Sequence, residues 1–251
     1  MKKMIYTITT GLLLVIFTSC DVVQTEKFRS YVIAYGNVDS ISLWKTESGN
    51  LLLRISHTDD VVNWLSKGDD KVKYDDLCRS HNDMNCFRTL SFIEFPNSGY
   101  FMMEDATAIN VTSNQDFDVN HPAGSSLNDV VRLCSASPAA YIRSNYKTSY
   151  DWQNSYPQGF SKEKELEDVR LGYENTLDNP SFDLKALYPI DDLLENITAE
   201  QLELLGPGNG FLIGYLIFES QPKTQCDHKL TVSMTTDTGK ILKTTIDYTF
   251  K

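Results

Sequence analysis

Residues 229–250 read KLTVSMTTDTGKILKTTIDYTF. Apolar and polar side chains alternate in this stretch, which is the pattern of β-strands with one buried face. Residues 237–240 separate the two strands and place Gly239 where a tight turn needs a positive φ. The stretch therefore predicts a terminal β-hairpin, a common way for a β-sandwich to end. The residues expected on its buried face are Leu230, Val232, Met234, Leu242, Ile246, Tyr248 and Phe250.

Further strand patterns precede the hairpin. The almost unbroken apolar run 211–219 predicts a buried strand immediately before it. Residues 87–95 and 100–104 flank a Pro-Asn-Ser-Gly turn and are expected to form a second hairpin. Strand-forming residues bounded by turn residues also predict strands at 29–35, 41–45, 51–56, 108–113 and 140–144.

Helix signals are few. Thr198, with Gln201 three places later, makes a capping box inside the segment 192–205, and Gly206-Pro207 ends the expected helix. A brief helix is expected after Thr58, and one helical turn at 129–133. The polar, charge-dense segment 67–85 is expected to be a surface excursion.

These patterns predict an all-β or β-dominated protein with an Ig-like β-sandwich architecture and a few short helices in its connections. Cleavage before residue 20 would leave 232 of the 251 residues, enough for one large domain or two small ones. We expect a β-rich domain over 28–251, built as one sandwich or as two closely packed β units, with an irregular segment at 145–190.

The N-terminus has the layout of a bacterial lipoprotein signal. Lys2 and Lys3 precede an uncharged run, 4–17, which is shorter than the roughly 20 residues of a membrane-spanning helix. Ser19 then stands directly before Cys20, the position at which a thiol is loaded with lipid and the chain is cut. The sequence predicts a signal peptide at 1–19, lipidation of Cys20, a tether at 20–27 and anchoring to the outer membrane, with the periplasmic and surface faces both open.

The charge of the expected mature chain is strongly negative. Removal of Lys2 and Lys3 leaves 21 of the 23 basic side chains against 34 acidic ones. Nucleic acids and anionic lipid surfaces both require a positive face, so neither is an expected partner. Solubility at a negatively charged cell surface is the simplest explanation of the acidity. Binding of divalent cations or of a basic partner is the alternative.

Four cysteines remain besides the expected lipid anchor. An even number in an exported chain suggests two disulfides, and three pairings are formally open. Cys78 with Cys86 would close a short polar loop and leave Cys134 with Cys226 as a long-range link. The alternative is that some or all of the four are buried thiols.

The chain resembles uncharacterised lipoproteins of gut Bacteroidetes, which form a domain family of unknown function. The features that carry the resemblance are the lipoprotein signal, the stretch DFDVNHPAG at 116–124 leading to Leu-Asn-Asp at 127–129, the helix at 198–206 and the final hairpin. The resemblance implies a β-rich outer-membrane lipoprotein. It supplies no activity and no catalytic residue.

Two metal sites are considered from residue spacing. Asp116, Asp118 and Asn120 place oxygen side chains at alternate positions, as loops that wrap Ca²⁺ do, although the stretch lacks the glycine and distal glutamate of an EF-hand. The alternative is an Asx turn, in which these side chains bind backbone amides. Cys78, His81 and Cys86 could ligate zinc, but their spacing matches no defined finger.

Catalytic motifs are weak. The four histidines are not accompanied by a Gly-x-Ser-x-Gly elbow, and the adjacent aspartates at 69–70, 75–76 and 191–192 are most simply solvated loop charges. A carboxylate pair for glycoside hydrolysis meets in space rather than in sequence, so a glycan hydrolase stays the alternative function. We expect no cofactor.

An aromatic cluster marks the segment after residue 140. Exposed aromatic side chains could stack on sugar rings or on a protein partner, whereas buried ones would be core beneath a long loop. The leading hypothesis is a non-enzymatic binding or structural module that is held at the outer membrane through Cys20 and binds a glycan or an envelope protein. Its candidate ligand surface is Tyr141, Tyr146, Tyr150, Trp152 and Tyr156.

Overall fold

The computed structural model describes residues 24–46, 49–86, 88–92, 100–151, 186–205, 212–223 and 227–250. The predicted signal peptide at 1–19 lies outside these ranges, as do Cys20, Trp152, Tyr156 and Cys226. The strands are β1 (Gln24–Phe28), β2 (Ala34–Lys45), β3 (Leu51–Asn63), β4 (Arg88–Phe92), β5 (Phe101–Met102), β6 (Ala106–Ser113), β7 (Val131–Ser137), β8 (Tyr188–Leu193), β9 (Leu212–Phe218), β10 (Asp227–Thr236) and β11 (Ile241–Thr249). The helices are α2 (Asp69–Ser80), α3 (Ala139–Arg143), the 3₁₀ helix η2 (Leu194–Asn196) and α6 (Ala199–Leu202).

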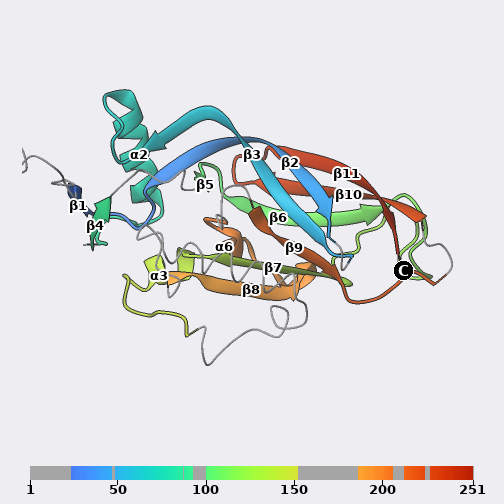
Figure 1. Cartoon of the computed structure of the whole chain (residues 1–251). Coiled ribbons are helices and arrows are strands. Elements are labelled where there is room, and N and C mark those ends of the chain that lie inside the picture. The colour runs from blue at the N-terminus through green and yellow to red at the C-terminus, as the bar shows by residue number, and fades with distance from the viewer. Residues whose placement is uncertain are drawn as a thin grey trace, which may run out of the picture.

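The described strands form two main sheets and one small one. The large sheet has the order β5-β2-β3-β9-β7-β8, the second sheet is β11-β10-β6, and β1 pairs with β4. All pairings are antiparallel except that of β2 with β5. In Figure 1, α2 and the β1–β4 pair stand at one end of the molecule and the three-stranded sheet lies toward the other. The prediction of a β-dominated, sandwich-like fold is confirmed.

The terminal hairpin forms as the alternation predicts. β10 and β11 pair from Asp227 with Thr249 to Thr235 with Ile241, and Gly239 adopts a φ of 83° in the turn. Leu230, Val232 and Met234 are fully buried, and β10 also pairs with β6 on its other side. The alternating face therefore becomes one wall of the main core.

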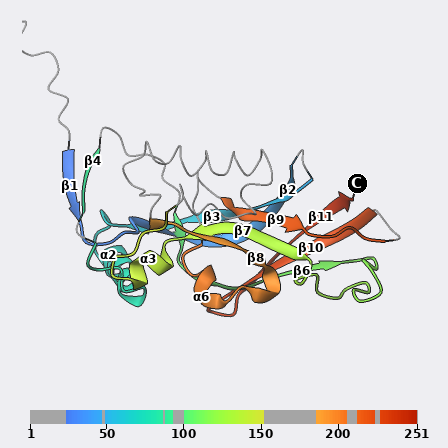
Figure 2. The same cartoon turned by 90° about the horizontal axis from the view of Figure 1, so that it is seen from below.

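The main core fills the space between the two sheets. Lys45 Nζ donates to the Thr249 carbonyl at 2.8 Å and Lys240 Nζ donates to the Val38 carbonyl at 2.5 Å, so β11 lies beside β2 at the edge of the sandwich. Leu202 and Leu205, from the α6 region, belong to the same core. In Figure 2, α2, α3 and α6 lie on the same side of the large sheet as β6.

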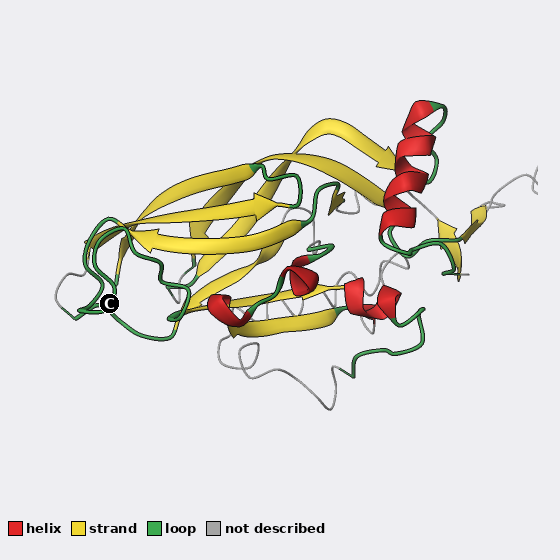
Figure 3. Cartoon of the chain, turned by 180° about the vertical axis from the view of Figure 1, so that it is seen from behind, coloured by secondary structure: helices red, strands yellow, loops and turns green. Residues whose placement is uncertain are grey.

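A second apolar cluster lies at the α2 end of the chain; Figure 3 shows α2, the longest helix, at this end beside the strands. Its buried members come from the chain before β2, from β2, β3 and β5, from α2 and α3, and from connections between elements. They include Tyr31, Val32, Tyr35, Tyr74, Cys78 and Ile142. This cluster, rather than the main core, supports the candidate site.

Several local predictions are wrong. Residues 140–144 form the helix α3 instead of a strand, 129–133 lead into strand β7, and the residues after Thr58 continue β3 rather than starting a helix. The hairpin expected from 87–95 and 100–104 does not form, because β4 pairs with β1 and β5 pairs with β2. The capping box of Thr198 and Gln201 is present, but α6 has only four residues; of the residues expected before it, 192–193 belong to strand β8 and 194–196 form the 3₁₀ helix η2.

Candidate functional site

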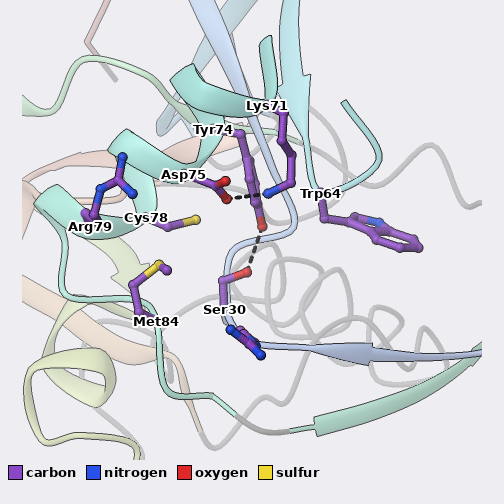
Figure 4. Close-up of a pocket in the computed structure, with 9 residues that line it drawn as sticks. Ser30, Trp64, Lys71, Tyr74, Asp75, Cys78, Arg79 and Met84 are labelled. Atoms are coloured by element: carbon purple, nitrogen blue, oxygen red, sulfur yellow. Dashed lines mark hydrogen bonds and ion pairs between the residues drawn. The ribbon is translucent and has the colours of Figure 1, made fainter. Parts of the chain in front are cut away.

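A pocket of about 320 Å³ lies against α2. We call it the Ser30 pocket. Figure 4 shows side chains from α2, from the chain before β2 and from the turn after β3 converging on it. Its lining residues are Arg29, Ser30, Trp64, Lys71, Tyr74, Asp75, Cys78, Arg79 and Met84.

Helical spacing in α2 places the lining side chains. Asp69 and Asp70 occupy the first turn and Arg79 the last, which suits the helix dipole. Tyr74 and Cys78 are four residues apart and are the two buried residues of the helix. Lys71 and Asp75 have the same spacing and form an ion pair. The charge-dense segment 67–85, expected to be a surface excursion, therefore contains the helix α2 with one narrow buried stripe.

The floor of the pocket is a chain of hydrogen bonds. The Tyr74 hydroxyl donates to the Val32 carbonyl at 2.7 Å, and its oxygen is 2.7 Å from the Ser30 hydroxyl. Tyr74 has one hydroxyl hydrogen and uses it on Val32, so Ser30 must be the donor in the second bond. The Cys78 thiol is a further side-chain hydrogen-bond partner of the Ser30 hydroxyl, whose two lone pairs still let the oxygen accept from one more donor.

Asp83 holds the floor in place. Its carboxylate is fully buried and accepts from the Tyr31 amide at 2.6 Å, from the Val32 amide at 2.8 Å and from the Tyr146 hydroxyl at 2.8 Å. Burial and this carboxylate raise the pKa of Tyr146. Asp83 thereby ties the turn after α2 to the segment that carries Ser30.

The thiol of Cys78 is a poor nucleophile. Burial, followed by the negative charge of Asp83, raises the pKa of Cys78 to about 11, so the thiol is protonated at neutral pH. The expected Cys78–Cys86 disulfide is not formed, and Cys78, Cys86 and Cys134 are buried thiols. This is the alternative that the sequence left open. Cys226, the proposed partner of Cys134, lies outside the described residues.

The rim of the pocket is more basic than the chain as a whole. Three of its lining residues are cations and one is a carboxylate, on a chain with a formal net charge of −11. Lys71 is paired with Asp75, and Arg79 with Asp76. Arg29 is exposed and has no ion pair with any described residue. Its guanidinium is therefore available at the rim.

The proposed calcium loop has the geometry of an Asx turn. One oxygen of Asp118 accepts from the amides of Asn120 at 2.8 Å and His121 at 3.0 Å, and Asp116 accepts from the Ala123 amide at 2.7 Å. The side chains thus fix the loop backbone. Among the described residues, no group of three or more His, Cys, Asp or Glu side chains is arranged to hold a metal ion.

His121 is clamped between two carboxylates. Its Nδ1 is 2.8 Å from Asp118 and its Nε2 is 2.8 Å from Asp129, and the ring lies edge-on to the fully buried Phe117. Burial lowers the pKa of His121, but the two carboxylates outweigh it, and the pKa is raised overall. The protonated ring links the loop to the turn before β7.

The stability contributed by this clamp should depend on pH. A raised pKa in the folded state means that the contribution is full below the unfolded value of about 6.5 and is lost as pH rises through the folded value. We expect His121→Gln to lower the melting temperature at pH 6 by about 2–4 °C, as for a loss of roughly 1 kcal/mol, and by less at pH 9. Thermal melts from pH 5.5 to 9 measure this; an equal deficit at every pH would contradict it.

His81, a residue of the zinc candidate, uses both of its ring nitrogens in other contacts. His81 Nε2 is 2.7 Å from Asp105 and its Nδ1 is 2.8 Å from the Leu77 carbonyl. Burial lowers the pKa of His81, but the hydrogen bond and charge of Asp105 outweigh it and the pKa is raised. A protonated ring with both nitrogens donating is not a metal ligand.

The described tyrosines of the aromatic segment pack on neighbouring rings. Tyr141 lies edge-on to Tyr31 at 5.8 Å between ring centroids and to Tyr146 at 5.6 Å, and both pack on the second cluster. Tyr150 lies 5.6 Å from Tyr188. These three tyrosines are half-buried, and their role in a ligand surface stays a prediction. Trp152 and Tyr156, the other members of the predicted surface, lie outside the described residues.

Of the residues that line the Ser30 pocket, the sequence singled out only Cys78, as a disulfide or zinc candidate, and Asp75, as a solvated loop charge. The available signal was the four-residue spacing of Tyr74 and Cys78 within a charged segment, which marks a buried stripe on one helical face. Arg29, Ser30 and Trp64 come from separate parts of the chain. Only the fold brings them to the helix.

The described part of the chain is thus a β-sandwich with a small pocket at one end. Hydroxyl groups form the floor of this pocket, and basic side chains lie at its rim. Among its described residues, no helix is long and apolar enough to cross a membrane. The chain matches no family model, no curated protein and no solved structure in the comparisons made.

Proposed function

We propose that the chain is a lipid-anchored protein of the cell envelope that binds a ligand in the Ser30 pocket without transforming it. The observation that carries the proposal is the composition of that pocket. It combines an aromatic wall, Trp64, with a hydrogen-bonding floor, Ser30 and Tyr74, and its volume of about 320 Å³ is at the lower end of the roughly 300–1,000 Å³ typical of ligand sites.

The lining groups suit binding better than catalysis. Asp75 is the one carboxylate in the lining and is paired with Lys71, whereas glycoside hydrolysis uses two carboxylates about 5–9 Å apart. The thiol of Cys78 is held protonated, and no histidine lines the pocket. These features favour a binding module over the alternative, an exported glycan hydrolase.

The proposed lipid on Cys20 would hold the protein at the membrane. A diacylglycerol-modified cysteine adds about 0.8 kcal/mol of membrane affinity per buried methylene, so two chains hold a protein on the membrane almost permanently. We expect Cys20→Ala to move the protein from the membrane fraction to the soluble fraction after a high-salt wash. Thr18→Ala, which keeps a small residue in the signal, should leave it membrane-bound. Retention of the Cys20→Ala protein in the membrane would contradict the anchor.

Binding and hydrolysis are separated by one assay on the full chain in detergent. A panel of neutral and acidic polysaccharides is tested by affinity gel electrophoresis, with release of reducing ends measured in parallel. We expect retardation by at least one polysaccharide, no reducing ends, and weaker retardation for Trp64→Ala. Trp44→Ala is the matched control, because Trp44 is exposed on β2 and lines no part of the pocket. Release of reducing ends would instead support the hydrolase, and no retardation would overturn the binding proposal.

A further inference from the structure

The Ser30 pocket presents opposite hydrogen-bonding character at its two ends. At the floor, the Tyr74 hydroxyl donates its hydrogen to the Val32 carbonyl, and the Ser30 hydroxyl donates its hydrogen to the Tyr74 oxygen. The Ser30 oxygen can therefore only accept from a ligand in this arrangement. A ligand that satisfies the floor must present a donor there, such as a hydroxyl group.

The rim presents donors and positive charge. Arg29 has no ion pair with a described residue, and its planar guanidinium can form two parallel hydrogen bonds with a carboxylate. Lys71 and Arg79 add two further cations, each already balanced by an aspartate on α2. A ligand that satisfies Arg29 carries an anionic group.

The acidic groups near the pocket do not cancel this preference. Asp75, in the lining, is engaged by Lys71. Asp83, behind the floor, is fully buried, and its carboxylate oxygens accept hydrogen bonds from two backbone amides and a tyrosine hydroxyl. Cys78 adds no charge, because its thiol is protonated at neutral pH. Among the charged residues that line the pocket, only Arg29 has no ion pair with a described residue.

The wall between floor and rim is apolar. Trp64 is half-buried, packs on the second cluster together with Met84, and lines the pocket. Aromatic faces stack on the apolar faces of ring-shaped ligands. The available volume admits a ligand of about the size of one sugar ring.

We infer that the Ser30 pocket binds a ring-shaped, hydroxylated carboxylate of monosaccharide size, that is, an acidic sugar, with its carboxylate on Arg29, a hydroxyl on Ser30 and its ring against Trp64. This inference rests on the proposed binding function and specifies the class of ligand. It also explains why a basic rim is found on a strongly acidic chain.

The test compares three probes on the full chain in detergent by isothermal titration calorimetry. Glucuronate and glucose share the ring and most hydroxyls and differ in the carboxylate, whereas acetate has the charge without the ring. We expect glucuronate to bind at least about tenfold more tightly than glucose or acetate, as one charge-assisted contact allows. Its affinity should fall with added salt.

Two substitutions locate the binding. Arg29→Gln should weaken glucuronate binding about tenfold and leave glucose binding unchanged. Arg54→Gln is the matched control, because Arg54 lies over the ring of Trp44 at 5.6 Å and not in the pocket. It should change neither affinity. Both variants should melt at the temperature of the native protein, since Arg29 is exposed and Arg54 is half-exposed.

Each other outcome overturns a stated part of the inference. Equal binding of glucose and glucuronate would overturn the charge preference, and equal binding of acetate and glucuronate would overturn the ring preference. Absence of glucuronate binding, or binding unaffected by Arg29→Gln, would overturn the inference as a whole. None of these results decides the binding function itself, which the polysaccharide panel and the Trp64 variant test separately.

Discussion

Replacement of Asp83 by alanine is expected to lower the free energy of unfolding by about 3–4 kcal/mol at neutral pH. Its carboxylate is fully buried and is the acceptor for two backbone amides, those of Tyr31 and Val32, and for the Tyr146 hydroxyl. Each donor left buried without an acceptor costs about 1–3 kcal/mol. Relief of the desolvation of the carboxylate offsets part of this sum.

Urea unfolding of three variants measures the effect. Asp83→Asn keeps the shape and one oxygen acceptor but turns an NH₂ group toward a donor, so its loss should be smaller than that of Asp83→Ala yet still above 1 kcal/mol. Asp76→Ala is the control, because Asp76 makes an exposed ion pair with Arg79 and such pairs contribute about 0–1 kcal/mol. A loss below 1 kcal/mol for Asp83→Ala would show that the described contacts do not hold this end of the molecule.

The same carboxylate shows why the second cluster could not be predicted. Asp83 stands in a polar stretch with six charged residues between 69 and 76, and nothing in its neighbours separates it from solvated aspartates. Its burial depends on α2 packing against the start of β2, a contact between residues about fifty positions apart. Local pattern carries no information about such a pairing.

The terminal hairpin is the opposite case. The alternation in 229–250 fixes which side chains face the core, because a shift of one residue would expose the whole apolar set. Leu230, Val232 and Met234 are buried as predicted. Strand partners outside the hairpin were less predictable, since β4 and β5 are close in sequence but pair with β1 and β2.

The candidate ligand surface shows a related limit of local pattern. Tyr141 and Tyr146 are amphipathic, so the same residues suit an exposed stacking surface and a core with one buried hydroxyl. Tyr141, in α3, contacts the ring of Tyr31, and Tyr146, just after α3, donates its hydroxyl to Asp83. The sequence supplied both alternatives, and these contacts with distant segments could not be predicted from local pattern.

Substitution of Gly214 by alanine should also destabilise the protein strongly, by about 2–4 kcal/mol. Gly214 lies in β9 between β3 and β7, opposite Leu53 and Ser135. A Cβ atom there would stand 2.6 Å from the carbonyl oxygen of Cys134 and 2.9 Å from the Cβ of Ser135. Both belong to the neighbouring strand, so relief requires movement of the backbone in the centre of the large sheet. Overpacking of this kind typically costs 1–3 kcal/mol, and more where the backbone is the obstacle.

Gly36→Ala is the matched control for this prediction. Gly36 lies in β2, and its added Cβ would also meet an atom at 2.6 Å, but that atom is Nδ1 of the His57 side chain. A side chain can rotate away at the cost of an altered rotamer, about 0.5–1.5 kcal/mol, whereas a paired strand cannot. Urea unfolding should therefore show a loss for Gly214→Ala that exceeds the loss for Gly36→Ala by at least about 1 kcal/mol. Equal losses would mean that β9 can separate from β7 at little cost, and that the close approach of these two strands does not help to fix the sheet.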